Sequence, residues 1–189
     1  MMPLDDNLTG TIEEVSGTAK IIVQYKNGKK HGIAQYIAST GAVLSEIEYY
    51  EDKINGNVVQ YYPSGMKLSH MEYKDGQLDG TAQTFYENGI IQMRAEYKEG
   101  NLNGRYETYD EFGDKVEVCI YQKGLKHGTD TLYYPKSHGG GVYEISTYIN
   151  GLLEGDKTSF DPQGHAIKTT PYKRGRAQRY PINFKVDEI

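Results

Sequence analysis

Few side chains in this 189-residue chain have the types and spacing of a catalytic or metal-binding site. The five histidines are His31, His70, His127, His138 and His165. No two of them have the i, i+4 spacing that places zinc ligands on one helix face, and no set of histidine, carboxylate and nucleophile is singled out. The sequence therefore predicts no catalytic residue, no metal site and no cofactor.

The single cysteine and the many glycines also have structural explanations. Cys119 occupies a repeated apolar position that it shares with Met71 and Ala95, which favours a buried structural thiol over a nucleophile. A lone cysteine can form neither an intramolecular disulfide nor a zinc cluster. The 22 glycines match neither phosphate-binding pattern, G-x-x-x-x-G-K-[ST] or G-x-G-x-x-G, so we attribute them to turns.

The charge is acidic but uneven. The net charge is −5, which argues against general nucleic-acid binding. Residues 1–167 hold 15 basic against 24 acidic side chains, or −9, whereas residues 168–189 hold 6 against 2, or +4. The first ten residues lack the basic and apolar segments of a secretory signal, and no apolar run reaches the ~20 residues needed to span a bilayer. We expect a cytoplasmic protein.

A tyrosine recurs through the chain at intervals of 24 residues, with one interval of 27. Glycine follows most of these tyrosines three, seven and sixteen residues later, and these three positions hold 17 of the 22 glycines. Internal repetition at such a period is typical of repeat architectures. The unit-opening tyrosines are Tyr25, Tyr49, Tyr73, Tyr97, Tyr121, Tyr148 and Tyr172.

Each unit contains two turn signals and two short runs, which predicts one β-hairpin per repeat. No window shows an apolar period of 3.6 residues, so we expect no helices. Stacked hairpins stabilise one another, and the predicted fold is all-β: an elongated, single, twisted antiparallel β-meander. Three extra residues in Pro135–Gly141 lengthen one hairpin loop. One aromatic or apolar position is expected in mid-strand, at Ile37, Tyr61, Phe85, Tyr109, Tyr133 and Phe160.

The repeats predict a single domain over residues 1–189. A partial unit occupies residues 1–24 and the repeats occupy residues 25–171. Residues 172–189 open a last unit and end in a basic cap.

The pattern Y-x-x-G-x-x-x-G, followed by an aromatic residue and a further x-x-G, resembles the MORN repeat. The spacing of 24 and the recurring E-Y-K-[DE]-G are similar to the bacterial variant, over roughly residues 15–180. Asp52, Arg179 and the insertion at Pro135–Gly141 depart from the pattern. The resemblance implies stacked hairpins. It also implies a role as a YwqK-type antitoxin or immunity protein, as a scaffold, or as a lipid-associated module.

Two repeated sets of side chains are candidates for partner binding. Glu48, Glu72 and Glu96 each precede a unit-opening tyrosine and form either a solvated ladder or an acidic stripe for a basic partner. A second set directly follows the mid-strand aromatic position. These residues either point outward as binding anchors or cover the reverse face of the sheet. They are Tyr62, Tyr86 and Tyr134.

The basic tail has three interpretations. The tail could cap the last strand, which we favour, contact anionic lipid, or reach toward the acidic body. Its cations are Lys168, Lys173, Arg174, Arg176, Arg179 and Lys185. The candidates for lipid or anion contact are Lys173, Arg174, Arg176 and Arg179.

We expect a non-enzymatic interaction protein that neutralises a cognate, basic protein toxin without contacting nucleic acid. The alternative is a scaffold or membrane-peripheral module. A third hypothesis, an enzyme with its site in the loop around His138, is the weakest. The sequence leaves the oligomeric state and the binding face open.

Overall fold

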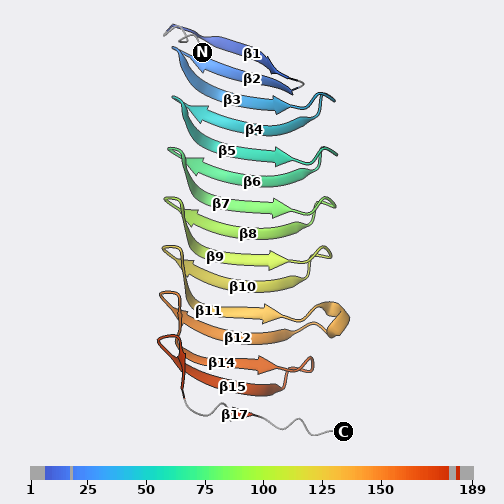
Figure 1. Ribbon diagram of the computed structural model, residues 1–189, viewed down its shortest axis with the longest axis vertical. Helices are drawn as coiled ribbons and strands as arrows, with labels where there is room; N and C mark the ends of the chain where they lie inside the picture. The colour runs from blue at the N-terminus through green and yellow to red at the C-terminus, as the bar shows by residue number, and fades with distance from the viewer. Residues whose placement is uncertain (1–6, 18, 179–181, 184–189) are drawn as a thin grey trace. The chain divides into compact units, whose positions relative to one another are not determined.

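The computed structural model describes residues 7–17, 19–178 and 182–183 of the chain. These residues form sequential β-hairpins in one antiparallel meander, which confirms the predicted fold class (Figure 1). The chain divides into two compact units, which we describe separately. Unit 1 comprises residues 1–90 and 97–100, and unit 2 comprises residues 91–96 and 101–189.

In unit 1 each strand pairs with its neighbour in sequence, and strands of eight and nine residues alternate after β2. The strands are β1 (Gly10–Ser16), β2 (Ala19–Lys26), β3 (Lys29–Ile37), β4 (Val43–Tyr50), β5 (Lys53–Tyr61), β6 (Lys67–Lys74) and β7 (Gln77–Phe85).

Unit 2 continues the pattern from β8, whose last two residues fall in unit 1. Its strands are β8 (Ile91–Lys98), β9 (Asn101–Tyr109), β10 (Lys115–Gln122), β11 (Leu125–Tyr133), β12 (Val142–Ile149), β13 (Leu152–Leu153), β14 (Gly155–Phe160), β15 (Ala166–Lys173), β16 (Arg176–Ala177) and β17 (Ile182–Asn183).

The tight turn after each unit-opening tyrosine has positive φ at both central residues, which is type I′ geometry. Asn27–Gly28 has φ values of 51° and 75°, and Lys123–Gly124 has 51° and 79°. Glu51–Asp52 adopts the same geometry, at 46° and 67°, without a glycine. The first glycine position of the repeat is therefore a turn position, as the sequence predicts.

Two positions differ from the sequence prediction. In most units the second glycine lies inside a strand, because a bulge occurs there: Ile47 pairs with Val58 but Tyr49 pairs with Ile54. In the unit opened by Tyr148, the second glycine, Gly155, begins β14. The strands thus begin directly after the type I′ turn. The aromatic position predicted in mid-strand consequently ends its strand, for example at Tyr61 in β5.

The inserted loop also contains a short helix that the sequence analysis did not expect. Lys136–His138 forms a single 3₁₀ turn, η1, and Tyr134 N–H donates to Gly141 O at 3.0 Å. The turn follows Pro135 and ends at Gly139, which has φ of 95°. An isolated 3₁₀ turn of three residues carries no apolar periodicity, so it cannot be recognised as a helix from the sequence pattern.

Successive hairpins are joined at their turns by a repeated pair of hydrogen bonds. In unit 1, Gly76 N–H donates to Ile54 O at 2.8 Å, and Asp75 N–H donates to Asn55 Oδ1 at 3.1 Å. In unit 2, His127 takes the position of Asn55, and its Nδ1 lies 3.5 Å from Asn150 N. This histidine therefore lies within β11, one residue before Gly128, and contacts the turn of the next hairpin.

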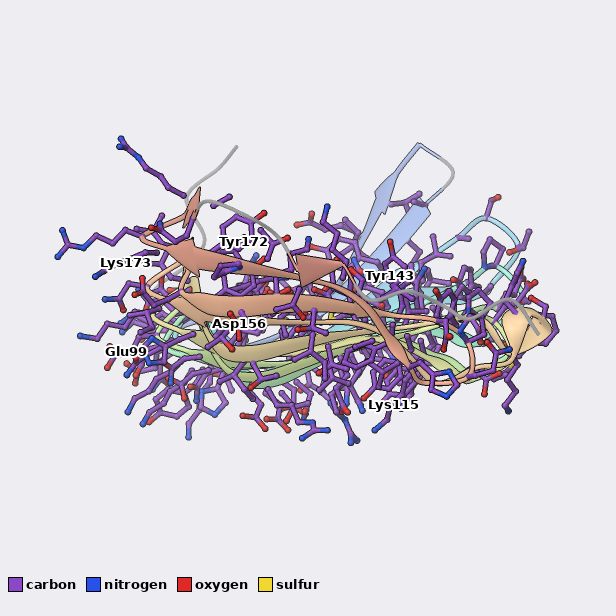
Figure 2. All side chains as sticks on the ribbon, turned by 90° about the horizontal axis from the view of Figure 1, so that it is seen from below. Glu99, Lys115, Tyr143, Asp156, Tyr172 and Lys173 are labelled. Carbon is purple, nitrogen blue, oxygen red and sulfur yellow. The ribbon has the colours of Figure 1, made fainter. Side chains whose placement is uncertain are left out.

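The strands bury little apolar surface. Among the described residues, the fully buried apolar side chains are Ala34, Ala82, Ala95 and Cys119. Figure 2 shows side chains projecting from both sides of the strands. Backbone pairing and cross-strand side-chain contacts therefore contribute more here than in a two-layer domain. Within the described ranges, no helix is long and apolar enough to cross a membrane.

Candidate functional site

The strand register assigns each repeat position to one of two sheet faces. Directly paired residues share a face, and residues two apart along a strand do so as well. Met71 pairs with Val58 and shares its face with Tyr73. We call this side, which carries the unit-opening tyrosines, the tyrosine face. The other side, which carries Glu72 and His70, is the reverse face.

The predicted acidic set lies on the reverse face in a structural role. The Glu48 Oε2 atom accepts a hydrogen bond from Asn57 N–H at 2.9 Å, and Glu72 and Glu96 accept equivalent bonds at 2.8 and 3.1 Å. Each carboxylate lies against the in-strand glycine of the bulge. A Cβ built on Gly56 would overlap the Glu48 carboxylate. The glycine and the glutamate therefore form one bulge-capping device, and a binding role for these glutamates stays a prediction.

The second tyrosine set lies one residue beyond the strand ends, so strand alternation does not determine its direction. Tyr62 OH donates to Phe85 O at 2.8 Å, and Tyr134 OH donates to Phe160 O at 2.8 Å. Tyr134 also packs edge-on against Tyr143, at 5.1 Å between ring centroids. Tyr62, Tyr86 and Tyr134 are all half-buried. The hydroxyl contacts of Tyr62 and Tyr134 join one hairpin to the next, and partner binding by the three tyrosines stays a prediction.

Three of the four cations predicted to contact lipid or an anion are exposed in the structure. Lys173, Arg174 and Arg176 line a shallow hollow together with Gln178. Figure 2 shows Lys173 at one end of the strands. The Arg174 backbone N–H donates to Glu154 Oε2 at 2.7 Å, so the turn is fixed while the side chain stays exposed. Arg179 lies outside the described residues.

In unit 2, the reverse face carries a cross-strand row without charge. Val118 pairs with Thr131, Thr131 with Ile145, Ile145 with Thr158, and Thr158 with Thr169. Thr158 Oγ1 and Thr169 Oγ1 are hydrogen-bonded at 2.9 Å. The row crosses five strands, β10, β11, β12, β14 and β15.

Three further uncharged side chains flank this row. Thr129 pairs with Thr147, and Ile120, which is 39% exposed, follows Val118 on the same face. We call the combined surface the uncharged face; its members are Val118, Ile120, Thr129, Thr131, Ile145, Thr147, Thr158 and Thr169. All eight are β-branched, so the surface has few accessible rotamers.

A salt-bridged carboxylate borders the uncharged face on β9. Glu107, which pairs with Val118, is 6% exposed and lies 2.9 Å from Arg105 Nη2 and 3.7 Å from Lys115 Nζ. Burial alone would raise the pKa of Glu107, but hydrogen bonds from Arg105 and Tyr109 outweigh burial and lower that pKa. This carboxylate is therefore charged at neutral pH.

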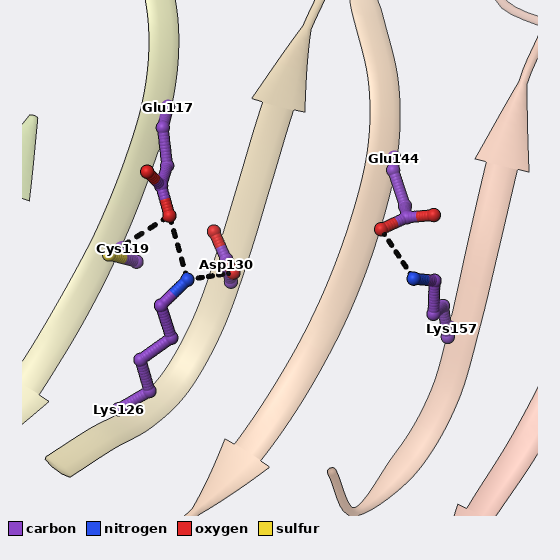
Figure 3. Close-up of polar contacts among 6 residues, drawn as sticks. All are labelled: Glu117, Cys119, Lys126, Asp130, Glu144 and Lys157. Atoms are coloured by element: carbon purple, nitrogen blue, oxygen red, sulfur yellow. Dashed lines mark hydrogen bonds and ion pairs between the residues drawn. The ribbon is translucent and has the colours of Figure 1, made fainter. Parts of the chain in front are cut away.

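The tyrosine face of unit 2 has the opposite character, because it buries a polar network (Figure 3). Lys126 Nζ lies 2.7 Å from Glu117 Oε1 and 2.6 Å from Asp130 Oδ2. Cys119 Sγ lies 3.8 Å from Glu117 Oε1, and the Cys119 side chain is 1% exposed. A second ion pair, Lys157 Nζ to Glu144 Oε1, measures 2.9 Å.

Burial perturbs the acid–base properties of this network. Burial raises the pKa of Asp130, because the Lys126 ammonium only partly offsets it. Burial also raises the pKa of the Cys119 thiol to about 12, assisted by Glu117. The thiol is therefore protonated at neutral pH in this environment, which agrees with the predicted inert, buried cysteine.

The uncharged face was not predicted from the sequence, although a signal for it was present. Ile120 stands at the repeat position that Glu48, Glu72 and Glu96 occupy in other units. Pro171 stands at the same position, directly before the unit-opening Tyr172. The change from glutamate to uncharged residues could have been read from the repeat alignment. The residues that β11 and β14 contribute to this face could be identified only from the pairing register of the strands.

Comparisons with known proteins support the repeat assignment. Residues 54–75 and 78–99 match the family model described as MORN repeat variant. No curated protein sequence matches the chain. Two crystal structures of TarM are similar over part of the chain. One is an S. aureus TarM mutant with fondaparinux, alpha-GlcNAc-glycerol and UDP, at 13% identity and a TM-score of 0.35, covering 64% of this chain and 22% of that chain. The other is TarM itself, at 14% identity and a TM-score of 0.33, covering 63% and 22%. The chain thus spans about a fifth of the length of these structures.

Proposed function

We propose that this protein, which carries MORN repeats of the variant type, is a non-enzymatic protein-binding protein that holds its partner on the uncharged face of unit 2. The supporting observation is the uncharged row from Val118 to Thr169 on paired strands. Equivalent positions in unit 1 carry Gln35, Glu46 and His70.

Two unfavourable contributions to the free energy of binding, desolvation of charge and ordering of side chains, are small at this face. A partner that covers this row desolvates no charged group within it, and burial of an unpaired charge is among the largest unfavourable contributions to binding. The β-branched side chains have few rotamers to lose, and their backbone is fixed by pairing on both sides. The threonine hydroxyls supply hydrogen-bond donors and acceptors to a partner.

We further propose that the partner is a cognate protein toxin, so that the protein acts as a cytoplasmic antitoxin or immunity protein. Residues 1–167 carry a net charge of −9, from 15 basic and 24 acidic side chains. A basic toxin would be steered toward such a chain before the uncharged face makes contact.

The decisive variant is Ile120→Glu. It introduces a charge into the uncharged face, yet glutamate is the native residue at this position in other repeats, where it caps the bulge N–H. The variant is therefore expected to fold, and its affinity for the partner should fall by at least about tenfold. Isothermal titration calorimetry with the purified partner measures the change.

The matched control is Glu72→Ile, which makes the reverse exchange in unit 1. It should lower the stability of the fold by about 1–3 kcal/mol while leaving partner affinity unchanged. Equal affinity of wild type and Ile120→Glu would exclude the uncharged face as the binding surface.

The antitoxin assignment is tested by co-expression with the product of a neighbouring open reading frame. Growth should be restored by the wild type and by Glu72→Ile, and not by Ile120→Glu. A neighbouring toxic product that wild-type protein neither binds nor suppresses would contradict the assignment.

A second candidate function is peripheral membrane binding through Lys173, Arg174 and Arg176, which are exposed around one hollow. Sedimentation with vesicles containing anionic lipid tests this function. Binding should decline as salt rises and should vanish when the three cations are replaced by glutamine. Binding to neutral vesicles at the same level would contradict it.

A further inference from the structure

The polar network of unit 2 brings three potential metal ligands together from two strands. Glu117 and Cys119 lie on β10, and Asp130 lies opposite Cys119 on β11. One ligand atom from each residue lies within 4.8 Å of the others. Figure 3 shows the Glu117 and Asp130 carboxylates in contact with the Lys126 ammonium, and the Cys119 sulfur beside the Glu117 carboxylate.

The network holds more negative than positive charge. Lys126 is a single cation shared between two carboxylates, and the neighbouring Glu144 is paired with Lys157. Asp130 is 5% exposed, and its Oδ1 atom has no hydrogen-bond partner among the described residues. A buried carboxylate oxygen without a donor is costly, and a metal ion bound by both oxygens of Asp130 would satisfy Oδ1 as well as Oδ2.

We propose that Glu117, Cys119 and Asp130 form a binding site for a zinc ion, and that the Lys126 ammonium occupies the cation position when zinc is not bound. One thiolate and two carboxylates form a ligand set that suits zinc, and water or another ligand would complete four-coordination. On binding, the Cys119 thiol releases its proton to solvent and the thiolate sulfur donates to the metal.

The distances fit this exchange. The Lys126 nitrogen lies 2.7 and 2.6 Å from the two carboxylate oxygens, which is slightly longer than the ~2.0–2.2 Å of zinc–carboxylate bonds. The separation of 3.8 Å between Cys119 Sγ and Glu117 Oε1 is close to the ~3.5 Å between two ligands of a tetrahedral zinc ion. The Lys126 side chain is 26% exposed, so its ammonium can leave toward solvent.

Other repeats supply variants for the test. Ala95 stands at the position of Cys119, and Ala34 and Ala82 stand at the position of Asp130; all three alanines are buried. Cys119→Ala and Asp130→Ala therefore place in unit 2 residues that the repeat already accommodates. Leucine stands at the position of Lys126 in three repeats, at Leu78, Leu102 and Leu153.

The experiment is titration of the full chain with Co²⁺ as a spectroscopic substitute, followed by competition with Zn²⁺. Wild-type protein should develop a thiolate-to-cobalt charge-transfer band that zinc abolishes. Cys119→Ala should lose the band, and both alanine variants should bind zinc at least about tenfold more weakly. Lys126→Leu should bind zinc at least about tenfold more tightly, because the competing ammonium is gone. Glu72→Gln serves as the control and should match the wild type.

Circular dichroism of each variant ensures that only folded proteins are compared. The proposal is overturned if folded wild-type protein binds neither ion, or if it binds them as well after Cys119→Ala. Weaker zinc binding by folded Lys126→Leu would overturn the placement of the ion at the ammonium position.

Discussion

The two units place opposite chemistry at equivalent positions of one repeat. On the tyrosine face of unit 1, the central row is apolar and runs through Ala34, Ile47, Val58, Met71 and Ala82. On the tyrosine face of unit 2, the corresponding row contains Tyr106, Cys119, Asp130 and Ser146.

On the reverse faces the contrast is inverted: unit 1 carries charged and polar side chains there, and unit 2 carries uncharged ones. Unit 1 carries Glu46 and His70, both in side-chain hydrogen bonds, whereas unit 2 carries the uncharged face. The backbone repeat is shared by both units. It therefore sets the strands and turns but does not require that one particular face be apolar. One surface can change its chemistry for binding while the hairpin geometry is kept.

The largest expected effect comes from removing the cation of the polar network. Lys126→Met should destabilise the fold by about 3–5 kcal/mol, because Glu117 and Asp130 lose their shared partner in a buried site. Urea unfolding followed by circular dichroism measures the loss. The matched variant Lys30→Met lies at the same repeat position in unit 1, where the ammonium lies 5.0 Å from the Tyr49 ring.

Lys30→Met should reduce stability by no more than about 1 kcal/mol. Equal losses in the two lysine variants would contradict the difference between the units. A double variant, Lys126→Met with Asp130→Ala, should recover part of the loss because it leaves only one carboxylate of the original pair.

The bulge glycines provide a second comparison. Gly80→Ala should destabilise the fold by about 3 kcal/mol, because the backbone has φ of 124° and the new Cβ would displace the Glu72 carboxylate from its N–H partner. Gly128→Ala meets no atom within 4 Å and has φ of 92°, so only backbone strain of about 1–2 kcal/mol is expected. Denaturant midpoints compare the two. A larger loss for Gly128→Ala would show that the capping carboxylate is not part of the glycine requirement.

The pH dependence of stability should separate Asp130 from the other carboxylates. The folded-state pKa of Asp130 is raised by burial above its ordinary value of 3.8, so the folded state binds this proton more tightly than the unfolded state. The contribution of Asp130 to stability is thus fully present below pH 3.8 and is lost as pH rises through the raised pKa.

Asp130→Asn should remove this dependence. Measured from pH 3 upward, the unfolding free energy of the wild type should fall relative to that of Asp130→Asn as pH rises. A difference that moves in favour of the wild type would mean that Lys126 lowers the pKa of Asp130 below its ordinary value.

The smallest effect is expected at a type I′ turn. Lys123 has φ of 51° at the first turn position, where Asn150 stands in another repeat. Lys123→Asn should stabilise the fold by about 0.5–1 kcal/mol, because asparagine tolerates the left-handed conformation better than lysine. The thermal midpoint measures the gain. Asn150→Lys should show the reverse change, and a stabilised Asn150→Lys variant would contradict the turn argument.

Most of the local structure could be predicted from the sequence. The 24-residue period, one hairpin per repeat and the glycine turns all follow from spacing and turn residues, as at Asn27–Gly28 and Asn150–Gly151. The second glycine was assigned to a turn because spacing alone does not distinguish a turn from a bulge. At Gly56, the missing information was the carboxylate of Glu48, which lies on the neighbouring strand.

The candidate site was less accessible to sequence reasoning. Glu48, Glu72 and Glu96 were visible as a column, but their backbone partners nine residues later were not. Tyr62 was expected either to point outward as an anchor or to cover the reverse face, because a strand was assumed to continue through it, whereas β5 ends at Tyr61.

The sequence by itself determined the repeat, the hairpin and the type I′ turns, because these depend on residues that are close along the chain. Only the tertiary structure decided which side chains share a face, since pairing register and bulges bring together residues from different strands. Val118 and Thr169 are 51 positions apart and belong to one row through four successive pairings. Lys126 reaches both Glu117 and Asp130 because a bulge interrupts the register between Cys119 and Tyr121.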